Sequence, residues 1–197
     1  MITNYTNTPN FKAKFIDKTQ VKKLNKVTKK YENIEASFLE FDPKNKKDLK
    51  TLKDLSIYWN ESSFAWDICE TAKAIVENFI NPNTNKVYIL TKQKDNFKSL
   101  KYNDVLGLAD VESKENNIGE DILEIHRLQV DPEFAINNNN LNKKIPEIKH
   151  IGTEILNILK KFNKTIELNS VSSALDFYEI NGFKNINENP LNLRWRP

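Results

Sequence analysis

Residues 171–183, which read VSSALDFYEINGF, carry more information about the fold than any other stretch of this chain. Ala174, Phe177 and Tyr178 fall at helical spacing, so they share one face of a predicted helix. Asn181-Gly182 predicts the end of that helix, because glycine adopts the left-handed cap conformation at little cost. The apolar Phe183 that follows predicts a return to a strand.

The rest of the chain alternates between two kinds of hydrophobic pattern. Apolar residues at helical spacing predict helices over 45–59, 65–80 and 149–162, whereas alternating or β-branched runs predict strands over 35–41, 86–91, 104–112, 122–130, 165–169 and 191–196. The resulting fold class is α/β (α+β), with a mixed, mostly antiparallel central sheet flanked by helices on both sides.

Two segments stand apart from this pattern. Residues 1–33 carry eight lysines between Lys12 and Lys30 against the single acid Asp17, and the spacing of their few apolar residues predicts a basic helix over 18–31. We interpret 1–33 as a basic, solvated N-terminal arm and 34–197 as the main domain; a docking surface for RNA, an acidic partner or a second subunit is the alternative. The second segment is an Asn-rich insertion over 135–148.

Composition excludes several classes of protein. The formal net charge of +3 is too small to indicate nucleic-acid binding by itself. A single cysteine, Cys69, allows no intramolecular disulfide, and with only two separated histidines no metal site is expected. No apolar run reaches the ~20 residues of a membrane span, and the first residues lack the apolar core of a signal peptide, so a cytoplasmic location is expected.

The segment A-x-x-F-Y-E-x-x-G-F, residues 174–183, resembles the late motif of the GNAT superfamily, the acetyl-CoA-dependent N-acetyltransferases. A second resemblance lies earlier in the chain. Leu128, Val130 and Pro132-Glu133-Phe134 match the first half of the family's coenzyme motif, and Gly152-Thr153 with Ile155-Leu156 match the second half. The resemblance covers roughly residues 35–195 and implies acetyl-CoA as cosubstrate without a metal.

The resemblance also implies which residues bind the coenzyme. The open strand at Leu128, Gln129 and Val130 would pair with the pantetheine amides, and the start of the next helix would hold the pyrophosphate through Lys149, His150, Ile151, Gly152 and Thr153. This chain departs from the family at His150, which stands at the first glycine, and at Glu147, which stands at an Arg or Gln. Lys143, Lys144 or Lys149 could serve the phosphates if the inserted loop realigns. Val171 replaces a common Asn, for which Asn169 is the candidate substitute.

Two residues carry the implied chemistry. Tyr178 would protonate the departing thiolate, and Glu124, six residues before Val130, would be the general base, with Glu112 in reserve. The competing interpretations are a core aromatic for Tyr178 and a solvated or ion-paired strand residue for Glu124. We expect His126 to fill a strand face.

The sequence therefore predicts an N-acetyltransferase that moves acetyl from acetyl-CoA to a primary amine by direct attack in a ternary complex. The acceptor is a small-molecule or peptide amine, and the protein is a monomer or homodimer. The alternatives are a catalytically degenerate GNAT-like binding protein and an acetyltransferase that acts on RNA-linked or protein amines.

Overall fold

The computed structural model describes residues 13–42, 46–59, 64–94, 100–116, 118–135 and 145–197. The helices are α1 (Lys46–Tyr58), α2 (Phe64–Val76), α3 (Ile151–Lys160) and α4 (Leu175–Ile180), with 3₁₀ turns η1 (Tyr102–Asp104) and η2 (Ser172–Ala174). The strands are β1 (Lys14–Leu24), β2 (Tyr31–Glu40), β3 (Asn85–Thr91), β4 (Val105–Glu115), β5 (Asp121–Val130), β6 (Ile148–Lys149), β7 (Thr165–Asn169), β8 (Lys184–Asn185) and β9 (Asn192–Trp195).

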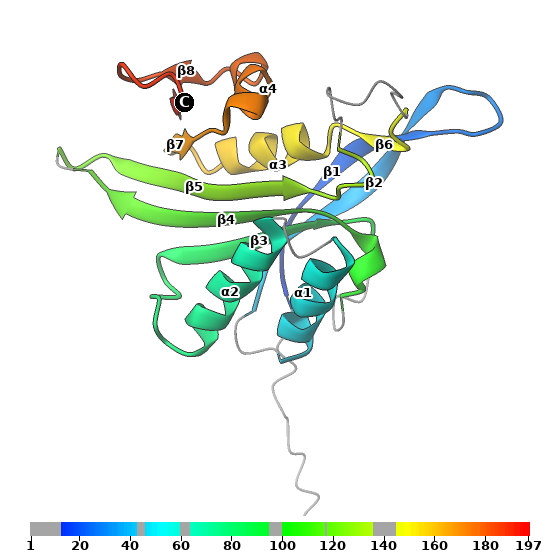
Figure 1. Cartoon of the computed structure of the whole chain (residues 1–197), viewed down its shortest axis with the longest axis horizontal. Coiled ribbons are helices and arrows are strands. Elements are labelled where there is room, and N and C mark those ends of the chain that lie inside the picture. The colour runs from blue at the N-terminus through cyan, green and yellow to red at the C-terminus, as the bar shows by residue number, and fades with distance from the viewer. Residues whose placement is uncertain (1–12, 43–45, 60–63, 95–99, 117, 136–144) are drawn as a thin grey trace, which may run out of the picture.

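These strands form one sheet in the order β6-β1-β2-β3-β4-β5-β7-β9-β8. Neighbouring strands are antiparallel except for β5 and β7, which run parallel. Helices α1 and α2 cover one face and α3 and α4 the other (Figure 1). The predicted fold class, a mixed and mostly antiparallel sheet with helices on both sides, is confirmed.

Each face of the sheet has its own hydrophobic core. Ile151, Ile155 and Leu159 of α3 pack with sheet residues such as Ala109 and Ile125. On the other face, residues of α1 and α2 pack with a different set of sheet residues; this second core includes Leu52, Leu55, Ile68, Ala72, Ile89 and Leu108. The residues at helical spacing in α1, α2 and α3 are mostly buried, but the helix predicted over 65–80 ends at Val76 and leaves Phe79 exposed. The predicted strands between 86 and 169 are present with small shifts of their ends.

The basic helix expected over 18–31 is wrong. Residues 14–24 form strand β1, which is paired along its length with β2. On the face toward α3, Val21 is fully buried, Thr19 donates a hydrogen bond to Glu154, and Asp17 forms an ion pair with Lys161 at 2.7 Å. Because two of these three inward residues are polar, the period-two pattern of the strand is hidden in the sequence.

The ends of the Asn-rich insertion lie on the described part of the chain. Its residues 136–144 are outside the described residues, and its last residue, Ile148, begins β6, which pairs with Lys22 and Lys23 of β1. The backbone N–H of Leu24 donates to the carbonyl of Glu147 at 2.8 Å. The insertion therefore returns to the sheet beside β1, directly before α3 begins.

The predicted stop at the end of α4 is confirmed in detail. Gly182 has φ +81°, its N–H donates to the carbonyl of Glu179, and the N–H of Phe183 donates to the carbonyl of Tyr178. These two bonds make a Schellman cap, which satisfies the last carbonyls of the helix. Phe183 itself is buried and precedes the short strand β8. Among the described residues, no helix is long and apolar enough to cross a membrane.

Candidate active site

Strands β5 and β7 part in the middle of β5. Their parallel pairing runs from Ile122 with Thr165 to Ile125 with Leu168 and then ends, while β5 continues to Val130. At the same point the register of β5 on β4 shifts: Arg127 is opposite Asp110 and Ile125 is opposite Val111, so His126 is an extra residue in a β-bulge. The bulge turns the strand, and within the described part of the chain the β7-facing edge of residues 126–130 has no strand partner.

Helix α3 begins beside this unpaired edge. A Cβ placed on Gly152 would lie 2.9 Å from Phe177 of α4 and 3.7 Å from Leu128 of β5. Gly152 is therefore where the first turn of α3, the end of β5 and α4 meet, and any larger residue would force them apart. The N–H groups of this first turn have no partner within the helix, which makes a helix start a binding site for anions such as phosphate.

His150 caps this helix in the left-handed conformation, with φ 67° and ψ 14°. Glycine reaches that conformation without the steric cost that a Cβ imposes. The sequence placed His150 at a glycine of the family motif, and the backbone explains the correspondence: the position needs a positive φ, whichever residue fills it. His150 therefore holds, in this chain, a backbone conformation that glycine reaches more easily.

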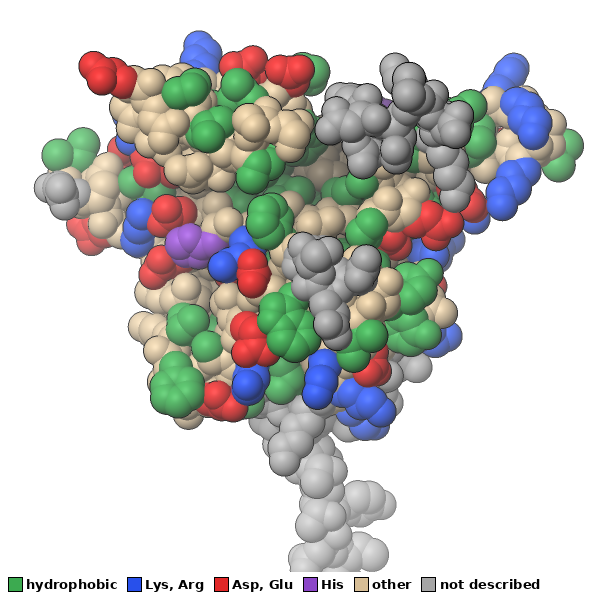
Figure 2. All heavy atoms as spheres, viewed as in Figure 1, with side chains coloured by type: hydrophobic (Ala, Val, Ile, Leu, Met, Phe, Trp, Pro, Cys, Tyr) green, Lys and Arg blue, Asp and Glu red, His purple; other side chains and the backbone are tan. Residues whose placement is uncertain are grey.

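Glu147, the other departure, is neutralised by the β1–β2 hairpin. Its carboxylate lies 3.6 Å from Lys23 and 3.5 Å from Lys26. Figure 2 shows basic side chains gathered at the end of the molecule where this hairpin projects in Figure 1. The amino group of Lys149 lies 4.2 Å from the centre of the Tyr31 ring, in a cation–π contact. Lys143 and Lys144 are outside the described residues.

Tyr178 lies in the core between α4 and the sheet. It makes edge contacts with Phe177 and Phe183, at ring-centre distances of 5.0 and 5.7 Å, and only 8% of it is exposed. Burial raises its pKa to about 12, because the phenolate would lose its hydration. The hydroxyl forms no hydrogen bond to any residue in the described ranges. Tyr178 is thus a neutral proton donor throughout the physiological range.

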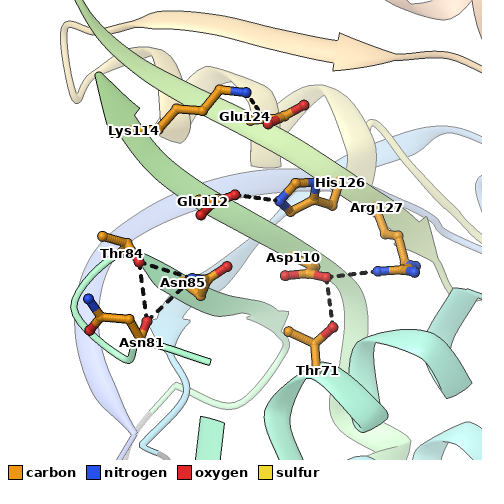
Figure 3. A network of polar contacts seen from close by, with 10 residues as sticks. All are labelled: Thr71, Asn81, Thr84, Asn85, Asp110, Glu112, Lys114, Glu124, His126 and Arg127. Carbon is orange, nitrogen blue, oxygen red and sulfur yellow. Dashed lines mark hydrogen bonds and ion pairs between the residues drawn. The ribbon is translucent and has the colours of Figure 1, made fainter. Parts of the chain in front are cut away.

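A row of charged side chains crosses β4 and β5 on the face toward α1 and α2. Glu112 and Glu124 are directly opposite one another. Lys114 forms an ion pair with Glu124, and Nε2 of His126 lies 3.2 Å from Oε2 of Glu112 (Figure 3). Two like charges at opposed positions repel, and Lys114 and His126 flank them on either side. Glu124, the predicted base, is therefore an ion-paired residue of this row.

Asp110 ties the bulge to α2. Its carboxylate accepts hydrogen bonds from Arg127, at 3.1 Å, and from Thr71 of α2, at 3.0 Å, and Arg127 also reaches Asp67 of α2 at 3.2 Å. Burial raises the pKa of Asp110, and the hydrogen bond from Thr71 and the charge of His126 act in the opposite direction. The bulge is thus anchored from the helical layer that covers this face.

The remaining predicted residues are spread around the same junction. Leu128 and Val130 pack onto the core under α3, and the amide of Gln129 donates to the carbonyl of Val130 at 2.8 Å. Ile151 is buried and Thr153 half-buried in the first turn of α3. Asn169 ends β7, one residue past the last pair with β5; it is paired with Asn192 of β9, and its side-chain amide donates to Asn192 at 2.9 Å. The predicted coenzyme residues therefore lie on β5, β6 and β7 and at the start of α3, and their role stays a prediction.

Sequence reasoning did not detect the bulge or the pairing of Glu112 with His126. A bulge adds one residue without changing the composition of a strand, so L-E-I-H-R-L-Q-V reads as simple alternation in the sequence. The one available signal was the polar pair His126-Arg127, two successive polar residues in an otherwise alternating strand. Both residues turn to the same face only because the bulge lies there.

No family model matches this chain, and no curated protein matches it. Solved structures do. AtaTR bound with AcCoA is 14% identical, with a TM-score of 0.50, over 81% of this chain and 92% of that one. A protein from Desulfovibrio desulfuricans assigned to the GNAT family is 11% identical, with a TM-score of 0.51, over 82% and 98%. A possible acetyltransferase from Clostridium difficile 630 is 15% identical, with a TM-score of 0.50, over 78% and 93%.

Proposed function

We propose that this protein, which has the fold of the GNAT acetyltransferases, is an N-acetyltransferase that transfers acetyl from acetyl-CoA to a primary amine. The observation that carries the proposal is the parting of β5 and β7 at a bulge beside the start of α3. This arrangement offers an open strand edge and unpartnered helix N–H groups at one place. A ligand that consists of an extended chain of amides ending in a pyrophosphate would bind through both: its amides at the strand edge and its pyrophosphate at the helix N–H groups.

The residues present fit such a substrate. The backbone of Leu128–Val130 would pair with the pantetheine amides as an added strand does, and the N–H groups of Gly152 and Thr153 would bind the phosphates. The left-handed backbone at His150 and the ion pairs of Glu147 with two lysines support this, because neither departure from the family motif leaves a free negative charge or an altered backbone at the helix start.

The reaction would proceed by direct attack in a ternary complex. An amine nitrogen attacks the thioester carbon, and a backbone N–H of the unpaired β5 edge stabilises the oxyanion that develops there. The C–S bond then breaks, and the Tyr178 hydroxyl protonates the leaving thiolate. Burial keeps that hydroxyl protonated until about pH 12, so the proton is available at every working pH.

The acceptor would approach from the face of α1 and α2. The charged row of Glu112, Glu124 and their neighbours lies on this face, next to the bulge (Figure 3). A small-molecule or peptide amine is the proposed acceptor class, since carboxylates favour a cationic approach and the amine must give up a proton here.

The proposal is tested by coenzyme A release with acetyl-CoA and a panel of amines, using the wild type and Tyr178→Phe. We expect release with at least one amine, and a fall of roughly 10²-fold or more in kcat for Tyr178→Phe with little change in coenzyme affinity. Equal turnover in the variant would remove Tyr178 as the acid. Release with no amine, despite coenzyme binding, would favour a degenerate binding protein.

A further inference from the structure

We propose that His126, held by Glu112, is the residue that removes the proton from the attacking amine, in place of Glu124. This inference rests on the proposed acetyl transfer. It concerns a specific pair of side chains that the sequence pattern assigned to a strand face. Three observations carry it: where each residue lies along β5, which partners each one already has, and how the bulge presents the imidazole.

Position along β5 separates the two residues. Glu124 lies within the stretch that is paired with β7, directly opposite Glu167, so the strand edge there is closed. His126 is the first residue of β5 past the last pair, Ile125 with Leu168. A substrate that adds to the open edge must lie at His126 or beyond. Glu124 leaves the backbone two residues farther back, where the edge is closed. Its carboxylate nevertheless lies within 4.8 Å of the imidazole, so the partners of the two side chains must decide between them.

The partners of the two residues also differ. The carboxylate of Glu124 is occupied by the ammonium group of Lys114, and their hydrogen bond raises the pKa of that lysine. A carboxylate bound in this way must break an ion pair before it can accept another proton. His126 has no cationic partner at its ring nitrogens: Nε2 lies 3.2 Å from the carboxylate of Glu112.

The geometry of Glu112 and His126 suits a base and its positioning residue. When Nε2 carries the proton directed at Glu112, Nδ1 presents its lone pair, and the imidazolium formed later is stabilised by the carboxylate. The side chain of His126 is 35% exposed, so an acceptor can reach it. The bulge lets His126 and Arg127 share one face, where Arg127 is fixed by Asp110 and Asp67.

The proton and electron balance is complete. The cationic acceptor first loses one proton to water and becomes the neutral amine; a second proton passes to Nδ1 of His126 as the nitrogen forms its bond to the carbonyl carbon. When the C–S bond breaks, the thiolate takes the proton of Tyr178. His126 then releases its proton to water and Tyr178 regains one from water, so no other reactant is consumed.

The test measures kcat/KM against pH for the wild type, His126→Gln, Glu112→Gln and Glu124→Gln. We expect His126→Gln to lower kcat/KM about 10²-fold and to remove the ascending limb of its pH profile. Coenzyme affinity, measured by calorimetry, and the melting temperature should be unchanged. Glu112→Gln should lose less and move the limb to lower pH, because the imidazolium loses its counter-ion. The other charged groups that face His126 are Asp110, Glu124, Arg127 and, through Arg127, Asp67 of α2. All four are unchanged in His126→Gln and in Glu112→Gln.

Imidazole rescue supplies a second readout. His126→Ala should regain activity when imidazole is added, whereas the same addition should not restore Tyr178→Phe. A His126→Gln variant that keeps the wild-type pH profile, while Glu124→Gln loses its limb, would overturn the proposal and return the role to Glu124.

A bound metal ion is an alternative explanation for the closeness of Glu112, Glu124 and His126, because their ligand atoms lie within 4.8 Å of one another. The assays are therefore repeated with a chelator. Loss of wild-type activity on chelation would overturn the free-imidazole base, and unchanged activity supports it. A wild type that binds no acetyl-CoA would overturn the proposed function, and the role of His126 with it.

Discussion

His150 shows how a single backbone angle can preserve a motif when its residue changes. At φ 67° this residue occupies the region that L side chains reach only at a steric cost. We expect His150→Gly to stabilise the protein by roughly 0.5 kcal/mol, the difference between the strain that is relieved and the extra flexibility of glycine in the unfolded chain.

Urea unfolding of the wild type and His150→Gly measures this effect, with His150→Val as the matched control. The β-branched valine is poorly suited to a positive φ and should destabilise the protein. If glycine destabilised it as much as valine does, the left-handed conformation at the start of α3 would be contradicted.

Tyr178 makes the stability of the protein depend on pH in the alkaline range. Its pKa is about 12 in the folded chain, against 10.0 for an exposed tyrosine. Between these values the hydroxyl ionises in the unfolded chain but stays protonated in the folded chain. The stabilisation is fully present below pH 10 and is lost as the pH rises toward 12. The loss amounts to about 2 to 3 kcal/mol, at about 1.36 kcal/mol per pKa unit.

The free energy of unfolding of the wild type and Tyr178→Phe, measured at several alkaline pH values, isolates this contribution. The pKa of Tyr88 is also raised by burial, but that residue is present in both proteins and cancels in the difference. The stability advantage of the wild type should fall with rising pH. Two parallel curves would mean that the phenolate of Tyr178 is as well solvated in the folded chain as in the unfolded chain.

At the scale of elements, the contact of α3 with α4 depends on the missing side chain of Gly152. A Cβ there would lie 2.9 Å from Phe177, well inside contact distance. Gly152→Ala should therefore cost roughly 1 to 3 kcal/mol by overpacking. Phe177→Leu, which shortens the facing side chain, should recover part of that loss in the double variant.

Chemical unfolding of the two single variants and the double variant gives the coupling energy between the two positions. A strongly favourable coupling is the expected result. Strictly additive losses would show that α4 does not pack on the start of α3 as described.

Most elements could be predicted because their buried residues are apolar and regularly spaced. Ile151, Ile155 and Leu159 mark the inner face of α3, and the Asn-Gly pair fixes the end of α4. Strand β1 could not be predicted, since Asp17 and Thr19 on its inner face meet polar partners on α3 in place of the core. The apparent helical spacing of Val21, Leu24 and Val27 favours a helix instead, although Val27 is exposed in the hairpin turn.

The site could be predicted less completely than the fold. Motif spacing named candidate coenzyme residues that lie on β5 and at the start of α3, and their role in coenzyme binding stays a prediction. The relation of Glu112, Glu124 and His126 depends on the register of β4 on β5 and on one extra residue in the bulge. Neither can be read from one strand alone, so the sequence could name the carboxylates but could not show which residue lies at the open edge.

At the scale of the whole molecule, the candidate site residues are divided between the two faces of the sheet. The face under α3 and α4 brings together the helix start, the unpaired β5 edge and Tyr178. The face under α1 and α2 carries the charged row around His126 (Figure 3). The bulge lies between these two sets of residues. The pairing with β7 ends there, and His126 and Arg127 turn to the second face.

The lysine-rich hairpin belongs to this architecture as well. β1 is a strand of the sheet, and Lys23 and Lys26 hold Glu147 directly before the start of α3. Beyond Lys22 and Lys23, which pair with β6, the outer side of β1 has no strand partner among the described residues, and charged residues on such an edge disfavour pairing with other chains.

Calorimetric titration of the full-length protein with acetyl-CoA tests the central claim most directly, with free coenzyme A and desulfo-coenzyme A alongside. The account predicts micromolar binding, reduced strongly in Gly152→Asp, whose carboxylate would repel the phosphates at the start of α3. Absence of binding at millimolar acetyl-CoA would contradict the account, because the open β5 edge and the α3 start would then not form a coenzyme site.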